Sequence, residues 1–241
     1  MVSHDEDLDW TLRTSSSCSD ASQHPLRVTA VEQACLRLPK PREPLYYFHT
    51  PEVIIPSALV VPVVEMDGLA ALVLTKRPAT MKNHAGDWVF PGGRIDEGID
   101  KDPLAAAYRE LEEELGVPQS SARIVGELDM RGPTLQGHTI SVFVGILDSV
   151  EVINPDPHEV SEVAVVPLIQ LADPEQHYAS NEVPYGYGTK EDDAEPRKLP
   201  VTMQFFKFGD GQLVWGTQGE ILWDLLAALL QDRPTIAQIR S

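Results

Sequence analysis

A strand, a glycine turn and a helix follow one another between residues 86 and 117, and this order constrains the fold more than any other feature of the chain. Trp88–Phe90 has the apolar character of a short strand, and Pro91–Gly93 ends it in a tight turn. Glycines in a turn let the backbone approach a ligand closely. Residues 103–115 are then predicted to form a helix. The chain therefore has to place the turn beside one face of that helix.

The helix over 103–115 has clear limits in the sequence. Asp102 is a good N-cap, Pro103 suits the first helical position, and Gly116 is a natural stop. Each residue turns a helix by about 100°, so side chains three and four positions apart share a stripe. The apolar stripe, which must face the core, consists of Leu104, Tyr108, Leu111 and Leu115.

A second stripe of this helix carries Glu110, Glu113 and Glu114. Carboxylates at this spacing repel one another, and the helix dipole disfavours anions in the C-terminal half. A divalent cation would offset both costs, and hard oxygen ligands favour Mg²⁺ or Mn²⁺. Ala106 and Ala107 are expected beside these glutamates, where they leave room for a ligand. From the helix alone, a solvated acidic face explains the pattern as well.

Apolar runs outside this segment predict further strands. Residues 58–64 and 69–75 flank Asp67-Gly68, which is a strong hairpin signal. Residues 174–200 are poor in large aliphatic side chains and are expected to form a long mobile loop. Mixed strands with few helices predict an α/β sandwich and not a doubly wound parallel sheet. The other expected strands lie near 123–130, 138–147, 161–167 and 201–208, and the other expected helices near 28–37 and 218–231.

Length and targeting signals bound the organisation of the chain. The 241 residues fit one domain with extensions. We expect the domain over 51–232, a partly irregular N-terminal extension over 1–50 and a C-terminal tail over 233–241. No apolar stretch approaches 18 residues, Cys18 and Cys35 lack C-x-x-C spacing, and the acidic start does not resemble a signal or transit peptide. A cytoplasmic protein without a disulfide framework is expected.

The charge of the chain limits its partners. Acidic residues outnumber basic ones by 37 to 19, which gives a formal net charge of −18. Such a chain lacks the basic surface of a protein that binds nucleic acid or an anionic membrane. A phosphorylated substrate is compatible with this charge only if it meets a divalent cation or a local cluster of lysine and arginine.

Arg109–Val117 resembles the second half of the Nudix hydrolase motif, G-x5-E-x7-R-E-U-x-E-E-x-G-U, in which U is aliphatic, and it matches every defined position. The first half departs from the motif, because the spacer is two residues longer. Asp100 is the nearest stand-in for the family's first glutamate. The resemblance implies an α/β/α sandwich with a mixed sheet, over about residues 55–230.

The segment upstream of the helix is similar to the additional motif of coenzyme A pyrophosphatases, L-L-T-x-R-(S/A)-x3-R-x3-G-x3-F-P-G-G. The spacings match from Thr75 to Gly93, with Pro78 in place of serine or alanine and Lys82 in place of arginine. Members of that subgroup also tend to have an aspartate and a lengthened spacer in the first half of the Nudix motif. The departure at Asp100 therefore agrees with the subgroup.

The family resemblance implies a metal-dependent attack of water on a diphosphate, with Mg²⁺ or Mn²⁺ as cofactor. The metal ligands that it implies are Glu110, Glu113, Glu114 and the backbone carbonyl of Gly92. Arg109 would orient the glutamates, and the general base would be either a glutamate of the helix, such as Glu110 or Glu113, or Glu159 in a distant loop. The bases expected to hold substrate phosphates are Lys76, Arg77, Lys82 and Arg94.

The resemblance favours hydrolysis of coenzyme A or acyl-coenzyme A to 4′-phosphopantetheine and adenosine 3′,5′-bisphosphate. One alternative is hydrolysis of ADP-ribose, an ADP-sugar or another nucleoside diphosphate derivative. Some ADP-ribose hydrolases carry a proline 15–16 residues beyond the motif, and Pro133 stands 16 residues past Val117. Another alternative is a ligand-sensing module of the Nudix fold without catalysis. The expected partner is thus a small nucleotide, and a homodimer stays open.

Overall fold

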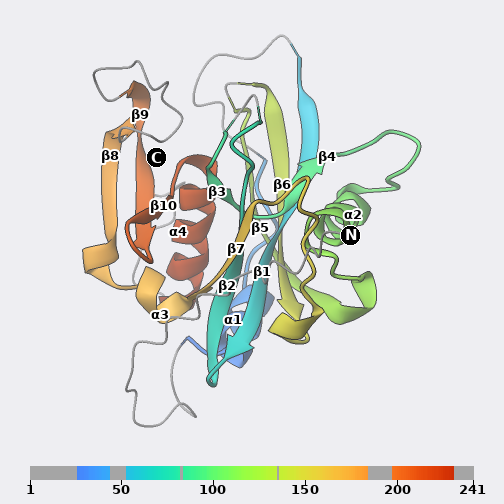
Figure 1. Ribbon diagram of the computed structural model, residues 1–241, viewed down its shortest axis with the longest axis horizontal. Coiled ribbons are helices and arrows are strands. Elements are labelled where there is room, and N and C mark those ends of the chain that lie inside the picture. Colours follow the sequence, from blue (N-terminus) through green and yellow to red (C-terminus); the bar gives the residue numbers. More distant parts are fainter. Residues whose placement is uncertain (1–25, 44–52, 82–83, 135, 184–196, 231–241) are drawn as a thin grey trace, which may run out of the picture.

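The hairpin predicted around Asp67-Gly68 begins the main sheet (Figure 1). β1 (Ile55–Met66) and β2 (Leu69–Lys76) pair antiparallel, and Asp67 and Gly68 have φ angles of 53° and 80°. Two successive positive φ angles are what a type I′ turn requires, and its twist matches that of the flanking strands. This computed structural model describes residues 26–43, 53–81, 84–134, 136–183 and 197–230.

β1 lies at the centre of a mixed sheet, as predicted. It pairs in parallel with β6 (His138–Leu147), which pairs antiparallel with β5 (Ala122–Arg131). β3 (Trp88–Val89) and β7 (Glu162–Pro167) pair antiparallel with β2, and β4 (Gly92–Arg94) pairs with the start of β1. The starts of β1 and β6, the end of β2, and β4 therefore lie at one end of the sheet (Figure 1).

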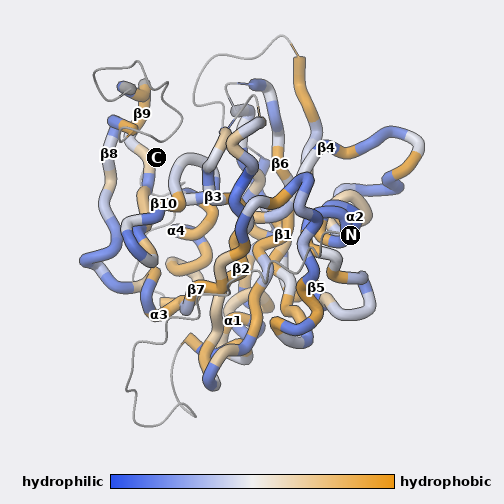
Figure 2. Tube along the Cα trace, in the orientation of Figure 1, coloured by the Kyte–Doolittle hydropathy of each residue, from blue (hydrophilic) through white to orange (hydrophobic). Residues whose placement is uncertain are grey.

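Helices cover both faces of this sheet, which makes the predicted α/β/α sandwich. α2 (Pro103–Leu115) packs on one face, and α4 (Gly216–Leu230) and α1 (Val28–Leu36) pack on the other. A strand with both faces buried has a continuous apolar sequence instead of an alternating one. This accounts for the run Ala58–Val64 in β1, and Figure 2 shows the hydrophobic residues concentrated in the middle layer.

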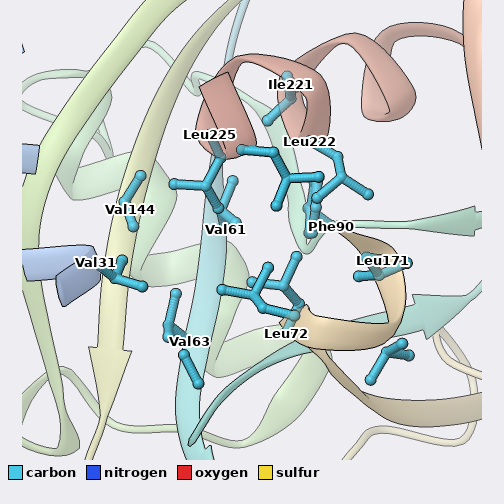
Figure 3. Packing of buried hydrophobic residues seen from close by; sticks show 14 of the residues in the cluster. Val31, Val61, Val63, Leu72, Phe90, Val144, Leu171, Ile221, Leu222 and Leu225 are labelled. Carbon is cyan, nitrogen blue, oxygen red and sulfur yellow. The ribbon is translucent and has the colours of Figure 1, made fainter. Parts of the chain in front are cut away.

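The larger core lies under α4. Leu222 and Leu225 of α4 meet Val61 of β1 and Leu72 of β2, and Val31 of α1 closes the layer (Figure 3). Each of these side chains is fully buried, and burial of such a side chain stabilises a fold by roughly 1.5–3 kcal/mol. The helix expected near 28–37 is thus confirmed, and it packs on the core of the domain.

The expectation of a long loop over 174–200 is wrong for its first part. Residues 177–183 form β8 (His177–Val183), which pairs with β9 (Arg197–Phe208) in a second sheet completed by β10 (Gln212–Val214). β8 is mostly polar and partly exposed, and its pairing rests on backbone hydrogen bonds, which leave no apolar pattern in the sequence. The rest of the expected loop, 184–196, lies outside the described residues.

The remaining elements are short. α3 (Leu168–Leu171) follows β7, and three 3₁₀ turns lie at Gln119–Ser121, Val150–Val152 and Pro174–Gln176. Most of the expected extension over 1–50 and the expected tail over 233–241 lie outside the described residues. Within the described part of the chain, no helix is both long enough and apolar enough to cross a membrane.

Candidate functional site

α2 begins and ends where the sequence predicts. The side chain of Asp102 accepts a hydrogen bond of 2.8 Å from the backbone N–H of Ala105, and Gly116 ends the helix with a φ of 65°. The expectation for Ala106 and Ala107 is wrong, because both are fully buried against β1. Their small side chains allow α2 to approach the sheet closely, and they leave no room for a ligand.

Glu114 is a buried carboxylate at the junction of α2 and the glycine turn, with 7% of the residue exposed. It accepts hydrogen bonds from the backbone N–H of Gly92 at 3.2 Å and from the Thr75 hydroxyl at 3.4 Å. Burial is the main cause that raises the pKa of Glu114 to about 8; the charges of Glu110 and Glu159 act in the same direction, and the Gly92 N–H and Arg77 oppose it. Nearby positive charge therefore does not offset the cost of ionising Glu114.

Glu110 lies one turn earlier on the same face of α2. A Cβ atom at Gly93 would overlap the carboxyl group of Glu110, and one at Gly92 would overlap the backbone of β1, so glycine is required at Gly92. Burial raises the pKa of Glu110, although its hydrogen bond from Arg109 acts in the opposite direction. Glu113, the third glutamate of the stripe, is half exposed. The half-buried Glu110 and the buried Glu114 thus flank the Gly92-Gly93 turn from the α2 side.

Arg109 holds this arrangement together. Its guanidinium donates hydrogen bonds to Glu110 and Glu113 at 2.8 Å, to both carboxylate oxygens of Asp100 at 3.1 and 2.9 Å, and to the backbone carbonyl of Arg94 at 2.9 Å. The hydrogen bonds to Asp100 are the main cause that raises the pKa of Arg109 above its usual range. A guanidinium fork engaged at every side fixes the positions of the carboxylates around it.

Asp100, the stand-in that the sequence suggests for the motif's first glutamate, is a hydrogen-bond partner of Arg109. The hydrogen bonds from Arg109 lower the pKa of Asp100 below its usual value. The longer spacer is absorbed by a turn, in which Asp100 donates its N–H to the Asp96 carbonyl at 2.9 Å and its carboxylate accepts the Asp96 N–H at 2.8 Å. The two additional residues therefore leave the Asp100–Arg109 contact intact.

Glu159 lies in a distant loop that the fold brings to the same glutamates. The loop is anchored on the end of α2, because Asn154 donates its N–H to the Leu115 carbonyl at 2.8 Å and Asp156 donates to the Glu114 carbonyl at 3.1 Å. The charge of Glu159 contributes to the raised pKa values of both Glu110 and Glu114. Glu159 is thus near them in space, although it is far along the chain.

The three bases singled out by sequence that the structure describes differ in their surroundings. Lys76 makes an ion pair with Glu162 and lies over the Trp88 ring, 5.6 Å from its centroid. The charge of Arg77 lowers the pKa of Glu114. Arg94 is exposed on β4, and Lys82 lies outside the described residues.

Two histidine contacts near the site were not found by sequence reasoning. His84 Nδ1 lies 2.9 Å from a carboxylate oxygen of buried Asp87, and His138 Nδ1 lies 2.8 Å from the hydroxyl of buried Ser57. The first pair is three residues apart, a spacing that could have been noticed. The second joins residues 81 positions apart, and only the pairing of β1 with β6 brings them together.

The donor set fits a hard divalent cation. Glu110 and Glu114 supply carboxylate oxygens beside the Gly92-Gly93 turn, and burial makes ionisation of Glu114 costly without a cation beside it. Within the described ranges, no three acidic, histidine or cysteine side chains already surround a single point. Arg109 holds Glu110 and Glu113, so their arrangement is set by the guanidinium.

Comparisons with known proteins agree with the family that the motif over Arg109–Val117 resembles. The NUDIX domain model matches residues 54–185, which is more than half of the chain. An "Uncharacterized Nudix hydrolase NudL" of Photorhabdus laumondii is 37% identical over 97 residues, which cover 40% of this chain and 51% of that protein. The protein of the same name from Pectobacterium atrosepticum is 28% identical over 178 residues, or 74% of this chain and 84% of that one. The chain thus spans about half the length of the first of these relatives.

Solved structures show weaker likeness. A C. elegans Ap4A hydrolase binary complex has a TM-score of 0.41 and 19% identity over 48% of this chain and 82% of its own. The NUDIX domain of Shewanella oneidensis NrtR complexed with ADP ribose has a TM-score of 0.41 and 20% identity over 49% and 75%. The assignment rests on the domain match, which contains the glycine turn, α2 and the Glu159 loop. The chain belongs to the Nudix family.

Proposed function

We propose that the protein is a metal-dependent pyrophosphohydrolase, which cleaves the diphosphate linkage of a nucleoside diphosphate derivative. The observation that carries the proposal is the buried carboxylate of Glu114, packed with the half-buried Glu110 against the Gly92-Gly93 turn. A fold does not retain a buried carboxylate such as Glu114 without a reason, because a buried carboxylate without an ion-pair partner is costly. Bound Mg²⁺ or Mn²⁺ would offset the charge of the diphosphate and lower the pKa of a coordinated water.

Each residue around the glutamates has a separate role in this proposal. Glu110 and Glu114 hold the metal ion, with Glu113 as a third carboxylate and the Gly92 carbonyl as an additional ligand. Arg109 and Asp100 fix the helix glutamates relative to β4, as their hydrogen bonds support. Loss of Asp100 should therefore misplace Glu110 without removing a ligand.

Glu159 is the general base of the proposal. It accepts a proton from the water whose oxygen attacks phosphorus, while the bond from that phosphorus to the bridging oxygen breaks and its electron pair leaves with the other phosphate. The anchoring of its loop on Glu114 and Leu115 supports this role, because it keeps a carboxylate beside the metal ligands. If a glutamate of α2 serves instead, Glu159→Gln should retain most of the activity.

Coenzyme A or an acyl-coenzyme A is the substrate that we propose, with 4′-phosphopantetheine and adenosine 3′,5′-bisphosphate as products. The motif resemblance over Thr75–Gly93 supports this choice. Incubation with Mg²⁺ or Mn²⁺ and a panel of coenzyme A, ADP-ribose, NADH and diadenosine polyphosphates tests it, with products separated by chromatography. Coenzyme A should be cleaved with the highest kcat/KM. A higher kcat/KM for ADP-ribose would contradict coenzyme A as the substrate and favour an ADP-ribose hydrolase. Binding without turnover would indicate a sensing module.

A further inference from the structure

Arg94, Ser57 and His138 form a cluster on the side of β4 that faces away from the glutamates. Arg94 is the cross-strand partner of Ser57 in the pairing of β4 with β1. Ser57 is buried, and its hydroxyl lies 2.8 Å from Nδ1 of the half-buried His138 at the start of β6. These three strand ends lie together at the upper end of the sheet in Figure 1.

The alternation of side chains along a strand places this cluster on the α4 face. Gly93 faces Glu110 and is paired with Ala58, which belongs to the core under α2. Neighbouring residues point to opposite faces, and directly paired residues share a face. Arg94 and Ser57 therefore point toward the α4 face, one residue away from the turn that touches Glu110.

Arg94 gives the cluster a permanent positive charge in a chain whose net charge is −18. Within the described residues, no carboxylate forms an ion pair with Arg94. Burial lowers the pKa of the neighbouring His138, and the charge of Arg94 acts in the same direction. An arginine without a described acidic partner, beside an imidazole, is suited to bind an anion.

His138 is oriented by a buried partner, because the Ser57 hydroxyl lies 2.8 Å from its Nδ1. Among the described residues, no hydrogen bond engages Nε2 of His138, which is thus available to a ligand. An anion at Nε2 of His138 selects the tautomer that carries its proton there, with Nδ1 accepting from the Ser57 hydroxyl. Arg94 adds a planar fork of donors that matches phosphate oxygens.

We propose that Arg94 and His138 form a binding site for a phosphomonoester group of the substrate, separate from the diphosphate site at the glutamates. This inference rests on the proposed function, because the diphosphate is assigned to the α2 side of β4. Coenzyme A carries such a group on its ribose, whereas ADP-ribose does not. The site would thus select coenzyme A among nucleoside diphosphate derivatives, with Ser57 as a positioning residue for His138.

The first test compares coenzyme A with 3′-dephospho-coenzyme A as substrates of the full chain with Mg²⁺. Arg94→Ala and His138→Ala should each lower kcat/KM for coenzyme A at least tenfold, and that for the dephospho compound less than twofold. Ser57→Ala should lower the ratio of the two values in the same direction. Arg37→Ala, which removes an exposed arginine at the C-cap of α1, is the matched control and should leave both values unchanged.

The second test does not depend on turnover. Calorimetry should show that adenosine 3′,5′-bisphosphate binds the wild-type chain at least tenfold tighter than 5′-AMP, and that Arg94→Ala removes the difference. Equal affinities, or an equal loss for both nucleotides in Arg94→Ala, would overturn the phosphomonoester site. If no substrate is cleaved but the binding difference holds, the proposed function fails and the site stands. If both coenzyme A forms are cleaved equally in every variant, the site fails and the function stands.

Discussion

Glu114 and Asp224 are both buried acids on helices, but they lie on opposite faces of the sheet and differ in what surrounds them. Asp224 of α4 makes an ion pair with Arg131 of β5, and both side chains are less than a tenth exposed. Glu114 of α2 accepts only from a backbone N–H and a hydroxyl, and no described base makes an ion pair with it. The first acid is neutralised within the fold, whereas the second has no ion-pair partner among the described bases, as the proposed metal site requires.

The largest effect on stability should come from breaking the ion pair between Asp224 and Arg131. Asp224→Ala leaves the guanidinium of Arg131 buried without its partner, and such a change costs about 3–5 kcal/mol of unfolding free energy. Urea denaturation measures this loss directly. The variant should retain the wild-type kcat/KM at temperatures where it is folded, because the pair lies on the face opposite to Glu114. A loss below about 1 kcal/mol would show that the pair is not a structural unit.

Glu114→Gln should lower the activity without lowering the free energy of unfolding. The amide keeps an oxygen that accepts from Gly92, and it removes a buried charge, so the metal-free variant should be at least as stable as the wild type. Its kcat should fall at least hundredfold, which corresponds to about 2.7 kcal/mol in the activation barrier. Glu112→Gln, on the exposed side of the same helix, is the matched control. Unchanged activity of Glu114→Gln would contradict its assignment as a metal ligand.

A divalent cation should stabilise the protein through Glu114 on α2 and not through Asp224 on α4. At a Mg²⁺ concentration of about 100 times Kd, binding to the native state adds roughly 2.7 kcal/mol to the unfolding free energy. Thermal melts with and without Mg²⁺ should show this increase in the wild type and in Asp224→Asn, but not in Glu114→Gln. An equal increase in Glu114→Gln would place the ion elsewhere.

The parts of the fold that could be predicted are those whose causes are local. The limits of α2 follow from the capping of Asp102 and the left-handed Gly116, and the hairpin follows from two residues with positive φ. These features depend on residues within one turn of one another. The strand at His177–Val183 could not be predicted, because it is stabilised by its pairing with Arg197–Phe208.

The same distinction applies to the candidate site. The spacing along α2 places Glu110 and Glu114 on one face, and the structure adds that both meet the glycine turn. Sequence alone could not show that Ala106 is needed for close helix packing, because a small residue suits either a ligand or a neighbouring strand. The contact of Ser57 with His138 depends on the register of two strands, which no local pattern encodes.

A dependence of stability on pH should also separate the two acids. Burial raises the pKa of Glu114 from 4.5 to about 8, so between these values the metal-free native state holds a proton that the unfolded chain releases. The unfolding free energy should therefore fall as pH rises through this window, by up to about 1 kcal/mol per pH unit, and Glu110 acts in the same direction. Carboxylates with lowered pKa values, such as Asp100, act below this window.

Urea denaturation of metal-free protein at pH 6, 7 and 8 measures the slope of the unfolding free energy against pH. Glu114→Gln should flatten it, Asp224→Asn should preserve it, and a slope that Glu114→Gln leaves unchanged would assign the titration to another group.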